Sequence, residues 1–313
     1  SFLSDRIAVE ATYYNQKTTD ALFNVRQIPS SGFTNINGAS SQLENVGVIN
    51  NKGYELALNG VIFQGESWAW DLGGTLFTNK STAGLPAELA EISIGGNGWI
   101  VDGEPVPVVR GECVTNPTAF AEPVIEDDCI YGPNSPTKGF GINTMITIPG
   151  GLRLAARGEY LGGHYVTAQV AHNAVRRSVS WAGCYDEYVI EQDGVGRSGL
   201  TANQRARCDP TLSDGNFWAE KADFFKLREV SLQYQLPESM LAGASGASLT
   251  VSGRNIFRWT NDEWTHFDPE MGNNNDNNSI SRDGADSGDF LVTSINEHIP
   301  APAMWTVQLR VVF

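Results

Sequence analysis

The sequence predicts an all-β protein whose strands form an antiparallel, up-and-down sheet in the wall of a transmembrane β-barrel. Three observations predict it: segments of alternating apolar and polar side chains, connections that alternate between short and long, and no helix-length apolar run. Side chains along a strand point alternately to its two faces, so such segments have one apolar and one polar face. A membrane helix needs about 20 consecutive apolar residues, and no segment supplies them.

The alternating segments recur from one end of the chain to the other. In the first, Val9 and Tyr13 alternate with Glu10 and Thr12. We predict strands near 6–14, 53–62, 67–78, 139–148, 151–161, 224–236, 247–257 and 304–313. In the last segment the apolar side chains are Trp305, Val307, Leu309, Val311 and Phe313.

The predicted connections sort by length. Those near 64–66, 149–150 and 237–246 are compact, and Pro149-Gly150 is a strong turn signal. We predict long polar loops at 15–50, 79–138, 163–222 and 259–303. Strict alternation of short and long links is typical of a membrane barrel with short turns at one rim and long loops at the other. A soluble, half-buried sheet also alternates and is the alternative.

Each face has an expected environment. We predict that the apolar side chains meet lipid: Val9, Leu56, Leu58, Trp70, Leu72, Ile142, Leu154, Val230, Leu232, Leu249 and Val251. Polar residues of the opposite parity are expected to line a wet interior, because the lumen of a large barrel is polar. They are Glu10, Glu55, Asn59, Asp71, Arg153, Arg157, Glu159 and Gln233. Lys226 and Arg228 fall on the apolar parity, so they either meet lipopolysaccharide phosphates or are turned inward by a bulge.

Charge and cysteine content restrict the possible partners. The net charge of −15 makes nucleic acid an unfavourable partner. Cys113 with Cys129, and Cys184 with Cys208, each lie inside one long predicted loop. An even cysteine count in local pairs favours two disulfides in an oxidising compartment. Free thiols remain the alternative.

Several stretches together resemble one family, the SusC/RagA-type TonB-dependent transporters of Gram-negative outer membranes. The similar stretches read D-R-I…Y-Y-N…T-D-A-L (5–22), N-V-G-V-I-N-N-K-G-Y-E-L (45–56), A-D-F-F-K-L-R…L-Q-Y-Q-L-P (222–237), S-G-R-N-I…T…D-P-E (252–270) and I-P-A-P (299–302). His266 and Phe267 depart from the pattern, since the family often has a glycine before D-P-E.

The resemblance implies that residues 1–313 are the C-terminal part of a barrel of about 22 strands. It implies uptake of an oligosaccharide or peptide nutrient into the periplasm, with no enzymatic activity and no cofactor. The implied partners are outer-membrane lipid and lipopolysaccharide, the N-terminal barrel and plug, the TonB complex, a SusD-like surface lipoprotein, and the insertion machinery that reads the terminal strand. No plug or signal peptide is recognisable in this sequence. A self-contained eight-stranded barrel is the rival architecture.

Other motifs favour no further chemistry. Gly194-Val-Gly196-Arg-Ser-Gly199 matches a dinucleotide-binding pattern but lacks the surrounding βαβ unit, so we expect a loop. His164, His172, His266 and His298 show no metal-ligand spacing, and we expect solvated loop residues. The Asn/Asp-rich segment 273–289 offers oxygen ligands for calcium without the EF-hand pattern. Trp99, Trp181 and Trp264 are candidates to stack on sugar rings, although burial in the loops is favoured.

Two further functional hypotheses stay open at this point. One is a surface adhesin or structural outer-membrane barrel that transports nothing. The other is a soluble, secreted β-protein that binds carbohydrate.

Overall fold

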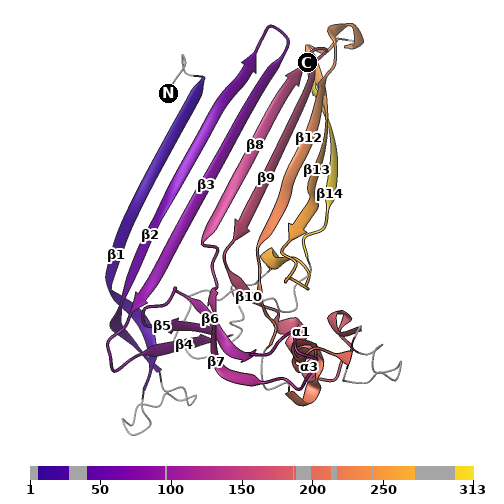
Figure 1. Cartoon of the computed structure of the whole chain (residues 1–313). Helices are drawn as coiled ribbons and strands as arrows, with labels where there is room; N and C mark the ends of the chain where they lie inside the picture. Colours follow the sequence, from indigo (N-terminus) through magenta and orange to yellow (C-terminus); the bar gives the residue numbers. More distant parts are fainter. Residues whose placement is uncertain are drawn as a thin grey trace.

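The computed structural model describes residues 6–27, 41–95, 97–185, 187, 199–212, 217–241, 243–271 and 300–313. Its largest feature is a curved antiparallel sheet in which neighbours in sequence order are neighbours in space (Figure 1). The eight strands are β1 (Ile7–Arg26), β2 (Ser41–Gln64), β3 (Ala69–Gly84), β8 (Lys138–Ile148), β9 (Leu152–Gly162), β12 (Phe224–Gln235), β13 (Gly246–Thr260) and β14 (Met304–Val312). This is the predicted all-β, up-and-down arrangement.

The sheet has two open edges. Within the described residues, β1 and β14 do not pair with each other, so the sheet is a wall and not a closed eight-stranded barrel. β1 begins and β14 ends at the same end of the sheet, where the turns are short (Figure 1). There Gly150 and Gly151 have φ values of +85° and +83°, a backbone conformation that glycine adopts without strain.

The register aligns the apolar alternates of all eight strands on one face. Directly opposed residues share a face. Pairs from the first strands include Val9 with Leu58 and Leu56 with Leu76. Further along, Leu154 opposes Leu232, which in turn opposes Val251. Every residue predicted to face lipid has this parity, and many of them are exposed, for example Val9 at 46% and Ile142 at 45%. An exposed apolar surface of this extent calls for an apolar surrounding.

β1 and β2 extend well beyond the predicted segments 6–14 and 53–62. The segment 15–50, which we expected to be a loop, is strand up to Arg26 and again from Ser41. Residues such as Gln16 and Thr18 lack the apolar–polar period, because a strand that projects beyond an apolar layer need not keep one apolar face. The apolar–polar alternation therefore marks only the part of each strand that has an apolar face. The backbone hydrogen bonds between the strands continue beyond that part.

The described parts of the 79–138 and 163–222 connections fold into a compact cap of their own at the opposite end of the sheet (Figure 1). The 79–138 connection forms a four-stranded sheet of β4 (Glu91–Gly95), β5 (Gly98–Val101), β6 (Val108–Val114) and β7 (Ile125–Pro133). The 163–222 connection holds β10 (Tyr165–Thr167), β11 (Ala219–Lys221), α1 (Gln169–Arg176) and α3 (Ala202–Cys208). Short 3₁₀ turns lie at Ala182–Cys184, Pro210–Leu212, Glu238–Met240 and Pro269–Met271. No helix in the described part of the chain is long and apolar enough to cross a membrane.

The buried hydrophobic residues lie mainly in and under this cap. One cluster joins Phe23 and Ala83 of the large sheet to Ile92 and Ile100 of the small one. A second packs Ala168, Ala171 and Trp218 around the Cys184 sulfur. The eight-stranded sheet thus contributes few residues to a protein core, whereas its connections have cores of their own.

Candidate functional site

The polar face of the large sheet carries all eight residues predicted to line a wet pathway. One row of opposed residues runs Glu10, Ala57, Thr75, Gly141, Glu159, Lys226 and Arg258 across seven strands. The next row toward the short turns contains Asn59, Gly73, Asn143 and Arg157, and another opposes Arg153 to Gln233. Asp71 has the same parity, opposite Met145. The register therefore places these charges on one surface, opposite to the apolar one.

Two local features show how this polar surface is shaped. Glu10, Thr12 and Glu55 border a hollow of about 320 Å³ over β1, β2 and β3. Further toward the short turns, Gly73 lies between the carboxamides of Asn143 and Asn59, and a Cβ at position 73 would collide with both. The glycine thus permits two amide groups to meet across three strands.

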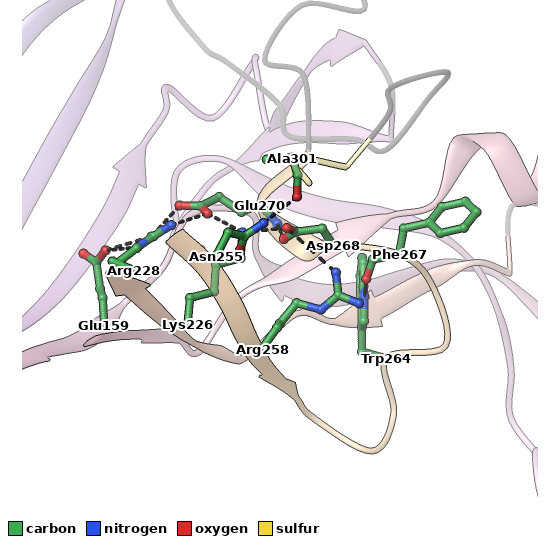
Figure 2. A network of polar contacts seen from close by, with 10 residues as sticks. All are labelled: Glu159, Lys226, Arg228, Asn255, Arg258, Trp264, Phe267, Asp268, Glu270 and Ala301. Carbon is green, nitrogen blue, oxygen red and sulfur yellow. Dashed lines mark hydrogen bonds and ion pairs between the residues drawn. The ribbon is translucent and has the colours of Figure 1, made fainter. Parts of the chain in front are cut away.

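A second cluster of polar residues joins the loop after β13 to the polar face (Figure 2). Lys226 is 3% exposed, and its ammonium nitrogen lies 2.6 Å from Asp268 Oδ2 and 2.5 Å from Glu270 Oε2. Arg228 donates to both carboxylate oxygens of Glu270, at 2.5 and 2.6 Å, and to Glu159 at 2.8 Å. Burial would raise the pKa of Glu270, but hydrogen bonds from Arg228 and Lys226 outweigh it and hold that pKa below its usual value.

A bulge in β12 explains why Lys226 and Arg228 take part in this network. The register shifts between Leu227 and Glu229, which inserts one extra residue into β12. The bulge puts Lys226 opposite Glu159 on the polar face. The expectation that these two cations meet lipopolysaccharide phosphates was therefore wrong, and the alternative of an inward-turning bulge holds.

The network also unites three motifs that are far apart in sequence. Lys226 and Arg228 belong to A-D-F-F-K-L-R, Asn255 belongs to S-G-R-N, and Asp268 and Glu270 belong to D-P-E. Asn255 donates to the Ala301 carbonyl just before β14, and Arg258 lies 3.8 Å from Asp268 (Figure 2). We call Lys226, Arg228, Arg258, Asp268 and Glu270 the charge latch, because together they fasten the 261–271 loop to the sheet.

The cap contains a pocket of about 390 Å³ that no sequence pattern indicated. It lies among β6, β7, β10, β11, α3 and the loop after β13. Its lining combines aromatic rings with charges of both signs: Tyr131, Tyr165, Phe217, Arg207, Lys221, Glu220, Asp262 and Glu263. Burial raises the pKa of Tyr131 to about 12. Loop residues have no period of 2 or 3.6, so nothing in the sequence signals that these side chains converge.

Glu220 organises one wall of this pocket. Its carboxylate accepts hydrogen bonds from the Thr265 backbone N–H at 2.8 Å and the Thr265 hydroxyl at 2.9 Å, and it pairs with Arg207. The Arg207 guanidinium stacks on the Trp218 ring, 4.0 Å from its centroid. Burial lowers the pKa of Arg207 to about 10.

The described histidines are buried, contrary to the expectation of solvated loop residues. His164 is 4% exposed, His172 is 7% exposed, and the His266 side chain is fully buried. His266 packs among the rings of Trp181, Trp218 and Trp264, with centroid distances of 5.2–6.1 Å. Burial, assisted by the Arg207 charge, lowers its pKa to about 3. These histidines are buried because the connections fold around their own cores.

Both disulfides predicted for the cap are present, Cys113 with Cys129 and Cys184 with Cys208. Closing loops of 16 and 24 residues stabilises the folded cap by about 3 kcal/mol each in the chain-entropy account. In the described part of the chain, these cysteines with Glu126 or Glu187 are the two groupings of metal-ligand type. Their sulfurs are bonded to each other, so neither offers the thiolate that binds a metal.

The three tryptophans proposed to stack on sugar rings differ in exposure. Trp264 is 5% exposed, while Trp99 and Trp181 are half-buried, and Arg110 covers the Trp99 ring at 4.7 Å. The Asn/Asp-rich segment 273–289, His298 and most of the 194–199 glycine motif lie outside the described residues.

Comparisons with known proteins bear on this arrangement. No family model matches the chain. The chain is 23% identical to TonB-dependent receptor P3 of Formosa agariphila over 93% of its own length and 32% of that protein. It is 31% identical to TonB-dependent receptor P26 of the same organism, over 36% of the chain. The predicted resemblance to TonB-dependent receptors is confirmed.

Solved structures give the fold independently. The RagAB peptide transporter matches with a TM-score of 0.61 and 19% identity, over 85% of this chain and 31% of that one. The RagAB importer in its closed-closed state matches with a TM-score of 0.58 and 20% identity, over 86% and 31%. The eight-stranded sheet thus has the fold of part of a SusC/RagA-type barrel. The chain spans about a third of the length of TonB-dependent receptor P3 and of the matched RagAB chain. These relatives are receptors and transporters, not enzymes.

Proposed function

We propose that this chain is the C-terminal barrel wall and cap of an outer-membrane TonB-dependent transporter of a Gram-negative bacterium. The observation that carries the proposal is the division of one continuous sheet into an apolar face and a charged face. A wall of this kind suits lipid on one side and water on the other. Glu10, Glu55, Asn59, Asp71, Arg153, Arg157, Glu159 and Gln233 would border the pathway.

The partners follow from the resemblance. The open edges at β1 and β14 would pair with the remaining strands of the barrel, because an unpaired edge is costly in lipid. A plug in the rest of the receptor would couple transport to the TonB complex, and a SusD-like lipoprotein would close over the cap. Trp305, Val307, Leu309, Val311 and Phe313 of the last strand would serve as the insertion signal.

The chemistry of the cap pocket favours a peptide over a neutral oligosaccharide as the nutrient. Lys221 can bind a peptide carboxylate, while Asp262 and Glu263 can bind an amino group or a basic side chain. Tyr131, Tyr165 and Phe217 add apolar area between these charges. A site for uncharged sugars would need fewer ionised groups. The RagAB structures named above are also those of a peptide transporter.

Uptake by the full-length receptor, expressed with a SusD-like lipoprotein, tests the function. Cells are supplied with fluorescent peptides or fluorescent oligosaccharides, and accumulation is compared with and without a functional TonB complex. We expect TonB-dependent accumulation of peptides, reduced several-fold by Lys221→Glu at unchanged surface abundance. Arg177→Glu, at an exposed site after α1, is the matched charge control. Accumulation of oligosaccharide only would overturn the peptide assignment, and no TonB-dependent uptake of either class would overturn transport.

A further inference from the structure

Four lysines gather on the apolar face of the sheet at the end nearest the cap. Lys52 of β2 lies directly opposite Lys80 of β3. Lys17 lies opposite Asn50, one row further toward the cap, and Lys138 lies opposite Thr78, one row nearer the apolar band. All four are exposed and share the parity of Val9, Leu56 and Leu76. The chain has six lysines in total, so this concentration is a property of one surface.

The cluster has no counter-charge from the described part of the protein. Like charges placed directly opposite each other on a sheet repel, as Lys52 and Lys80 must. No described carboxylate lies within 4.0 Å of any of the four ammonium groups. Glu10 of β1 and Glu55 of β2 have the parity of the opposite face. In a chain of net charge −15, such an isolated cationic patch suits an external anion.

The surface around Lys52 and Lys80 has the form of a site for an anion. These two lysines, Asn50 and Thr82 border a hollow of about 410 Å³. The Asn50 amide and the Thr82 hydroxyl supply hydrogen-bond donors beside the two ammonium groups. Phosphate oxygens accept hydrogen bonds from all of these groups.

The position of the cluster decides between possible anions. Moving along this face from the short turns, the side chains change from aliphatic (Leu58, Leu56) to aromatic (Tyr13, Tyr54) to cationic (Lys52). The two tyrosine rings pack with centroids 5.0 Å apart, immediately before Lys52. Apolar, aromatic and basic residues follow in this order where a membrane protein passes from hydrocarbon to the head-group layer.

We infer that Lys17, Lys52, Lys80 and Lys138 bind the phosphates of lipopolysaccharide in the outer leaflet. The inference rests on the proposed function, because it requires the apolar face to meet the outer membrane. Lys52 and Lys80 contact one phosphate in the hollow, and Lys17 and Lys138 flank it above and below. The phosphate site on this wall is therefore formed by these residues and not by Lys226 and Arg228.

Native mass spectrometry of the full-length receptor with titrated lipid A tests the inference. The receptor is placed in phosphatidylcholine nanodiscs, and diphosphoryl lipid A is compared with a dephosphorylated form. We expect selective retention of the diphosphoryl form by the wild type and at least a ten-fold loss of affinity in Lys52→Gln/Lys80→Gln. Arg176→Gln/Arg177→Gln removes two exposed charges from the end of α1 and is expected to bind as the wild type does.

The outcomes separate this inference from the proposed function. Quenching of Trp70 and Trp305 by brominated lipid in the same nanodiscs reports whether the apolar face meets lipid. Quenching together with undiminished lipid A binding by the lysine variant overturns the phosphate site and leaves the barrel intact. Equal affinity for inorganic phosphate and lipid A would overturn lipid as the source. Loss of the lipoprotein partner instead of lipid A would show that the cluster is a protein contact, and this too overturns the inference.

Discussion

At the scale of single residues, the parity of a side chain sets its environment. Leu154 and Gln233 belong to neighbouring strands but to opposite faces: Leu154 opposes Ile146 and Leu232, while Gln233 opposes Arg153 and Thr250. The alternation in the sequence was sufficient to separate these faces, because the side-chain period of a strand is two.

Leu154→Arg should destabilise the inserted receptor by about 2–4 kcal/mol, since this position is expected near the middle of the apolar band. Gln233→Arg adds the same charge on the polar face and should cost less than about 1 kcal/mol. Urea titration of the receptor folded in lipid vesicles measures both. Equal costs would contradict the assignment of the two faces.

Acidification should loosen the cap around His266. Its pKa is about 3 in the folded protein and about 6.5 when exposed, so folding favours the neutral ring. Below pH 6.5 the unfolded cap takes up a proton that the folded cap does not, and stability falls as the pH drops from about 6.5 to about 3. His164, whose pKa burial lowers to about 4, acts in the same direction. The Arg207 and Glu220 charges face His266 and pair with each other.

Tryptophan fluorescence of the cap during acid titration measures this effect, since three indole rings surround His266. His266→Gln removes one titrating group and should flatten the slope by up to about 1.4 kcal/mol per pH unit. His164 contributes to the remaining slope, and Glu270, whose pKa is held below its usual value, contributes at the acid end of the titration. A slope unchanged by the substitution would show that folding does not lower the pKa of His266.

At the scale of elements, the charge latch determines where the 261–271 loop lies. Lys226 and Asp268 are both almost fully buried, so each depends on the other for its charge balance. The sequence showed the three motifs, but only the bulge in β12 turns Lys226 and Arg228 toward D-P-E. A one-residue shift of register is invisible to a periodicity argument, because it depends on which neighbouring strand satisfies the backbone.

Asp268→Asn should release this loop at a cost of about 3 kcal/mol or more, because it leaves Lys226 buried with only the half-exposed Glu270. Hydrogen exchange of residues 261–271 measures the release. Glu229→Gln breaks the exposed pair with Arg254 and is the control, expected to cost at most about 1 kcal/mol. Similar exchange rates in the two variants would argue against the latch.

At the scale of the whole molecule, the sheet and the cap are stabilised differently. The cap has buried clusters and two disulfides, whereas the sheet leaves much of its apolar surface exposed. The receptor should therefore need lipid or detergent to stay monomeric, and its sheet tryptophans should contact acyl chains.

Brominated lipid should quench the fluorescence of some of the eight tryptophans in this chain and leave the others unquenched. Trp70 and Trp305 lie on the apolar face, with exposures of 40% and 69%, while Trp264 is buried in the cap at 5%. Trp70→Phe and Trp305→Phe should each reduce the quenched fraction, and Trp264→Phe should not. Quenching that depends on Trp264 instead would mean that the cap, not the sheet, faces the membrane.

The sequence alone determined the strand order and the two faces, and it predicted the pairing of the cysteines, with free thiols as the alternative. These depend on local period and on short spacings, which a linear chain displays directly. Only the tertiary structure revealed the small sheet in the cap, the mixed-charge pocket, the buried histidines and the lysine cluster beside the tyrosines. Each depends on residues brought together from distant connections or across strand register, and no local periodicity encodes that convergence.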